Sequence, residues 1–108
     1  MDTQDRYTAA REKYFSQNPA AEREINAVST AVIDACGMTV EDFREQRRIQ
    51  AFASAAEARG IDISEFVILL MSESPEQAHE WRLEQRRKVA SALGMEWSDY
   101  KNLNGIEE

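Results

Sequence analysis

Cysteine, histidine, glycine and proline are all scarce in this chain of 108 residues. A single cysteine, Cys36, permits no disulfide within the chain and is typical of a reducing compartment. Cys36 and the single histidine, His79, supply too few nitrogen and sulfur ligands for a zinc site. Four glycines and two prolines are too few for the frequent turns of an all-β chain.

Long apolar runs and excess positive charge are also missing. No segment has 18 consecutive apolar residues, and the first 13 residues hold no apolar run, so we predict neither a membrane span nor a signal peptide and expect a cytoplasmic protein. The chain has 20 acidic and 13 basic residues, a net charge of -7, which makes nucleic acid and anionic membranes poor non-specific partners. We therefore expect no membrane partner.

The composition is that of a globular domain, with 43% hydrophobic and 31% charged residues. The length is that of one domain. We predict a single helical domain over residues 1–108, with 1–3 and 104–108 frayed.

Apolar residues recur every three or four positions, which is the spacing of amphipathic helices. We expect the apolar positions, including Ile49, Val89 and Leu93, to face the core. Asn18-Pro19 and Ser74-Pro75 are helix starts, because each joins a capping side chain to a proline at the first helical position. The fold class is therefore all-α, a compact bundle of five or six short helices joined by Gly-capped corners. The expected helices span residues 4–16, 19–36, 40–59, 63–72 and 75–93, followed by a short helix around Trp97.

One corner pattern occurs three times, beginning at Gly37, Gly60 and Gly94. Each copy reads glycine, large apolar, polar, apolar, two polar residues ending in an acid, and aromatic. Glycine closes one helix in the left-handed conformation, and the third residue caps the next helix. We expect the third cap, Glu96, to be weaker than Thr39, and we expect the apolar second residue to contact the aromatic.

Catalytic chemistry is not indicated. Acid pairs such as Glu41 and Glu45 are expected by chance on the helices of an acidic chain, and no glycine-rich phosphate loop is present. Cys36 lies on an apolar stripe, where we expect a buried small hydrophobe, and we expect His79 at the surface. We predict a protein without catalytic residues, bound metal or cofactor, and hence not an enzyme.

The expected fourth helix carries six consecutive apolar residues, from Phe66 to Met71. Apolar side chains therefore surround this helix, and Ile68 points away from the face of Phe66 and Val67. A partner chain would cover Ile68, Leu69 and Met71, which we predict as partner-binding residues. The alternative is that another helix of the same chain covers them.

Residues 88–105 resemble a repressor-type helix-turn-helix, through the spacing of Ala90, Gly94 and Tyr100. A DNA-binding protein is therefore the alternative function, aided by a local basic cluster at residues 82–88. Against it, the second helix would present Glu96 and Asp99 to the phosphates. We expect nucleic acid not to be the partner.

The phrases Ala35-Cys36-Gly37-Met38-Thr39 and Ala92-Leu93-Gly94-Met95, with the closing run 99–104, resemble a family of short all-helical bacterial proteins of mostly unknown function. The chain is also similar in build to the quorum-sensing antiactivator QslA. That resemblance implies a dimeric regulator that sequesters a transcription factor by blocking its dimerisation. No binding residue can be carried over from it. We expect an acidic, homodimeric regulatory protein that acts by protein–protein binding.

Overall fold

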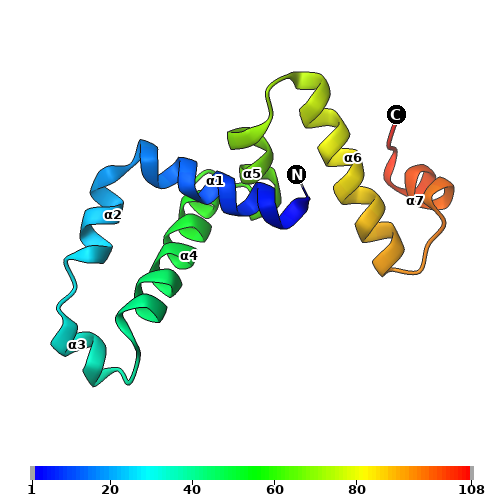
Figure 1. Cartoon of the computed structure of the whole chain (residues 1–108). Coiled ribbons are helices and arrows are strands. Elements are labelled where there is room, and N and C mark those ends of the chain that lie inside the picture. The colour runs from blue at the N-terminus through cyan, green and yellow to red at the C-terminus, as the bar shows by residue number, and fades with distance from the viewer. Residues whose placement is uncertain (1, 108) are drawn as a thin grey trace. The chain divides into compact units, whose positions relative to one another are not determined.

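The computed structural model describes residues 2–107, which form helices joined by short links and contain no strand (Figure 1). The prediction of an all-α fold built from short helices is confirmed. Seven helices lie in this range: α1 (Thr3–Gln17), α2 (Pro19–Asn26), α3 (Thr30–Ala35), α4 (Val40–Ala58), α5 (Ile63–Met71), α6 (Pro75–Ala92) and α7 (Trp97–Asn104).

Contacts divide the chain into two compact units, which are described separately. The N-terminal unit ends at Met71 and holds α1–α5, and the C-terminal unit begins at Ser72 and holds α6 and α7. A single domain over residues 1–108 stays a prediction. Within residues 1–3, which we expected to be frayed, the Asp2 side chain caps α1 by accepting a hydrogen bond from the Asp5 amide at 2.8 Å. Residues 1 and 108 lie outside the described residues.

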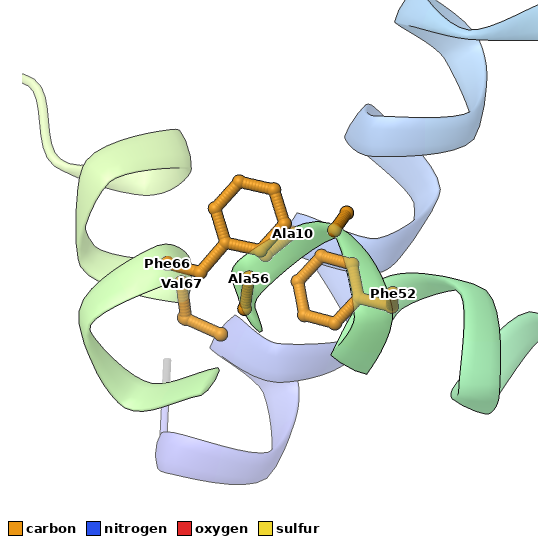
Figure 2. Close-up of a cluster of buried hydrophobic side chains, with 6 residues drawn as sticks. Ala10, Phe52, Ala56, Phe66 and Val67 are labelled. Atoms are coloured by element: carbon orange, nitrogen blue, oxygen red, sulfur yellow. The ribbon is translucent and has the colours of Figure 1, made fainter. Parts of the chain in front are cut away.

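The core of the N-terminal unit lies where α1, α4 and α5 meet (Figure 2). Phe52 of α4 is fully buried, and its ring stacks on that of Phe66 of α5, with centroids 4.8 Å apart. Tyr14 of α1 meets both rings edge-on, at 5.8 and 5.9 Å. The fully buried Ala10 contributes a small side chain to the same cluster. This aromatic packing fixes α5 against α1 and α4.

The expected helix over 19–36 is two helices, which is why residues 2–107 form seven helices and not five or six. Ser29 begins α3 as its N-cap, with its hydroxyl accepting from the Val32 amide at 3.3 Å. Both α2 and α3 contact α4 (Figure 1). Asn18 makes no side-chain cap for α2, and its amide instead donates to the Tyr14 carbonyl at 2.8 Å, at the end of α1.

The three glycine corners form as predicted. Gly37, Gly60 and Gly94 have φ values of 72°, 70° and 71°, a region where a side chain would be strained. The residue after each glycine donates back to the last turn of the preceding helix, as in the Schellman motif. Thr39 caps α4 by accepting from the Asp42 amide, whereas Glu96 makes no side-chain cap, which confirms that the third cap is weaker.

In the C-terminal unit, α6 packs against α7. Ser74 caps α6 as predicted, accepting from the Gln77 amide at 3.1 Å. The guanidinium of Arg87 lies over the Trp97 ring, 5.2 Å from its centroid, and Lys101 lies 5.8 Å from it. The cation–π contact of Arg87 thus joins α6 to α7, whereas that of Lys101 lies within α7. Every residue of α7 (Trp97–Asn104) is at least partly exposed.

Candidate protein-binding surface

The three residues predicted to bind a partner have different surroundings in α5. Ile68 is 6% exposed, so its own chain covers it, as the alternative interpretation expected. Met71 is half-buried and packs against the core of the N-terminal unit. Leu69 is 56% exposed. The structure therefore leaves Leu69 on the surface, and a role for the three residues in binding stays a prediction.

A row of side chains with one exposed large apolar residue runs along α4. Ile49 is 43% exposed, Ala53 lies one turn further on, and the exposed Glu57 follows after another turn. Because residues four apart lie on the same side of a helix, these three side chains form one row, which we call the α4 stripe. The stripe leads into an open groove of about 610 Å³ at the corner between α4 and α5. The groove is lined by Ala53, Ala56, Glu57, Gly60, Ile61, Asp62, Ile63 and Ser64.

A second apolar surface runs along α6. Val89 is 38% exposed and Leu93, the residue that ends the helix, is 63% exposed. Arg82 and the exposed Arg86 precede them at spacings that keep all four on one side of the helix, and we call this row the α6 stripe. The acidic Glu80 and Glu84 lie on the opposite side. The α6 stripe is thus apolar and basic, whereas the α4 stripe is apolar and acidic.

The link between α6 and α7 lies within residues 88–105 and joins the two helices through a glycine corner. DNA binding through this segment stays a prediction. Gly94 closes α6, and the Met95 amide donates to the Ala90 carbonyl at 2.9 Å. On α7, however, Asp99 is exposed while Lys101 is half-buried at the Trp97 ring. Leu103 is 75% exposed, the highest exposed fraction among the large apolar residues of the described part of the chain. The exposed side of α7 is therefore acidic and apolar.

Ion pairs between helices of the N-terminal unit line a charged depression of about 460 Å³. Arg48 of α4 donates to Glu22 of α2 from Nε at 3.1 Å and from Nη2 at 2.5 Å. Hydrogen bonds from Arg48 lower the pKa of the Glu22 carboxyl, and the same contact raises the pKa of Arg48. Arg11 of α1 forms an ion pair with Glu45 of α4. These charges hold α1 and α2 against α4.

The residues considered for catalysis belong to different units of the chain. Cys36 is exposed and follows the end of α3, so the expectation that it is a buried small hydrophobe is wrong. The cause is the break at Ser29, which turns α3 out of the register of α2. His79 is exposed on α6 of the C-terminal unit. Within residues 2–107, no cluster of three or more histidine, cysteine, aspartate or glutamate residues has the placement of a metal site.

Sequence reasoning assigned Ile49, Val89 and Leu93 to the core, and the structure places them on the surface. Helical periodicity places each of them on the same side of its helix as other apolar residues. Periodicity alone does not say whether that side meets another helix of the chain. A signal was available in the charges, because each row continues into residues of a single sign, Glu57 on α4 and Arg86 on α6.

The fold and these surfaces define a small all-helical protein with two exposed apolar stripes of opposite charge. The chain belongs to DUF6388, a family of unknown function, whose model matches residues 1–106. No curated protein and no solved structure matches it. In the part of the chain that the structure describes, every helix is too short or too polar to cross a bilayer.

Proposed function

We propose that this protein is a non-enzymatic regulatory protein that acts by protein–protein binding. The observation that supports the proposal is the row of exposed large apolar side chains on α6, Val89 and Leu93, together with the exposed Ile49 on α4. Exposed apolar residues are ordinary when they are scattered singly, but rows of them beside charges of one sign are typical of binding surfaces. Leu69 and Leu103 add further exposed apolar area on α5 and α7.

The proposed mechanism is occlusion. The protein forms a homodimer and binds a transcription factor through its remaining apolar surface, covering the surface that the factor needs for its own dimerisation. This is the action of an antiactivator, as in quorum sensing, and it needs neither a cofactor nor catalysis. The acidic character of the chain supports it, because a net charge of -7 keeps the regulator itself away from the DNA that its partner binds.

The experiment is a comparison of partner capture. The tagged chain and its Leu69→Asp and Leu103→Asp variants are incubated with lysate of the source organism, and bound proteins are identified by mass spectrometry. We expect a transcription factor that binds the unmodified chain and is lost with at least one variant. The purified factor should then change from a dimer to a mixed complex in light scattering when the chain is added. A factor that stays dimeric and bound to its DNA contradicts the proposal.

The alternative function is helix-turn-helix DNA binding through residues 88–105. The four-residue link between α6 and α7 and the exposed Arg86 favour it. The exposed Asp99 at the start of α7 opposes it, since an acid there repels phosphate. The two functions differ in their response to salt, because DNA binding weakens steeply as salt is added.

A further inference from the structure

The α4 stripe and the α6 stripe match each other in charge and in the spacing of their apolar residues. We propose that the α4 stripe of one copy binds the α6 stripe of a second copy, as an antiparallel helix pair. This inference rests on the proposed homodimer and names the surfaces that form it. The two stripes lie on α4 and α6, helices of 19 and 18 residues. Each helix is long enough for several turns of contact.

The antiparallel register follows from the spacing of the apolar residues. Placing Ile49 opposite Leu93 brings Ala53 opposite Val89, because each pair is four residues further along helices that run in opposite directions. The small Ala53 leaves room for the larger Val89, and Ile49 and Leu93 cover each other. The most exposed apolar residues of both stripes are thereby removed from water.

The charges agree with the same register. One turn beyond Ala53 and Val89, Glu57 of the first copy lies opposite the turn that holds Arg86 of the second. Continuing in that direction, Gly60 and the groove edge at Asp62 meet the turn that holds Arg82. A parallel arrangement would put the acidic end of the α4 stripe against the apolar Leu93, so charge selects the antiparallel direction.

A closed dimer uses this contact twice, since each copy supplies an α4 stripe to its partner and receives the partner's stripe in return. The acidic chain does not oppose the association at this surface, because the contact joins a basic row to an acidic row. The pairing also explains why Arg86 lies beside Val89 and Leu93 while Glu80 and Glu84 lie on the other side of α6.

The experiment uses charge reversal on the full chain, with association followed by sedimentation equilibrium. Glu57→Lys and Arg86→Glu should each raise the dimer dissociation constant about tenfold or more, because each sets like charges against each other at both contacts. Leu93→Asp should raise it about 100-fold. Glu41→Lys and Lys88→Glu make the same charge changes away from the two stripes and should have little effect. Circular dichroism confirms that each variant is folded.

Mixing the two charge-reversal variants distinguishes this dimer from other ways in which the chain could associate. An equimolar mixture of the Glu57→Lys and Arg86→Glu variants should form a heterodimer about as tight as the unmodified dimer, since both contacts regain opposite charges. If tight association recovers only when one chain carries both changes, and not in the mixture, the inference is overturned. A dimer that ignores both changes also overturns it while leaving the proposed homodimer standing. A chain that is monomeric at every concentration ends the proposed homodimer itself.

Discussion

The contact between Glu22 and Arg48 is the clearest case in which single residues position helices. The guanidinium of Arg48 on α4 makes three hydrogen bonds to the Glu22 carboxylate on α2, two of them to Oε1. Both side chains are about 30% exposed, 31% for Glu22 and 28% for Arg48, so water screens the pair only in part. We expect a modest stabilisation, on the order of 1 kcal/mol.

Glu22→Gln should therefore destabilise the fold at neutral pH, and the loss should shrink in acid. The lowered pKa of Glu22 in the folded chain means that its contribution is present above the pKa of about 4.3 for an unfolded glutamate. The contribution is lost as the pH falls through the folded value. Urea unfolding at pH 7 and pH 3 measures the difference, with the exposed Glu24→Gln on the same helix as the control. An equal loss at both pH values would contradict the assignment.

Ile68 and Leu69 are neighbours with opposite surroundings, and one pair of substitutions distinguishes them. Ile68→Asp places a carboxylate at a site that is 6% exposed and should cost about 3 kcal/mol or more of folding free energy. Leu69→Asp, at 56% exposure, should cost within about 0.5 kcal/mol. Thermal unfolding followed by circular dichroism checks both. If Ile68→Asp melts at the same temperature as the unmodified chain, Ile68 is a surface residue after all.

At the level of helices, the caps differ in a way that stability measurements can detect. Thr39→Ala removes the hydroxyl that accepts from the Asp42 amide and should cost about 1 kcal/mol. Glu96→Asp supplies the shorter acid that caps well where Glu96 makes no cap, and should gain about 0.5 kcal/mol for α7. Amide hydrogen exchange in the first turns of α4 and α7 measures each effect separately. Faster exchange in α7 of Glu96→Asp would contradict this account.

Most helix boundaries could be predicted because they depend on local chemistry. Gly60 and Gly94 close their helices through backbone geometry that a side chain disfavours, and the Ser74-Pro75 start needs only adjacent residues. The break at Ser29 was missed because a serine reads equally well as a polar position inside a helix. The candidate surface was harder to predict, because exposure of Ile49 or Leu93 depends on which helices meet, and that is decided far from those residues in sequence.

For the molecule as a whole, the balance of charge decides between the proposed function and its alternative. A protein of net charge -7 whose α7 exposes Asp99 has little to neutralise phosphates with, and the cations Arg87 and Lys101 lie over Trp97. The chain should therefore pass through a heparin column at about 50 mM salt without retention, and a labelled 30-base-pair duplex should show no salt-dependent binding. Lys101→Ala, on the helix that would enter the DNA groove, serves as the comparison variant.

Retention that falls steeply with salt, and that is reduced by both Arg86→Ala and Lys101→Ala, would instead support DNA binding through residues 88–105. Because replacing Arg86 also removes a charge from the proposed dimer contact, the loss of heparin retention has to be measured at concentrations where the unmodified chain and the variants have the same oligomeric state.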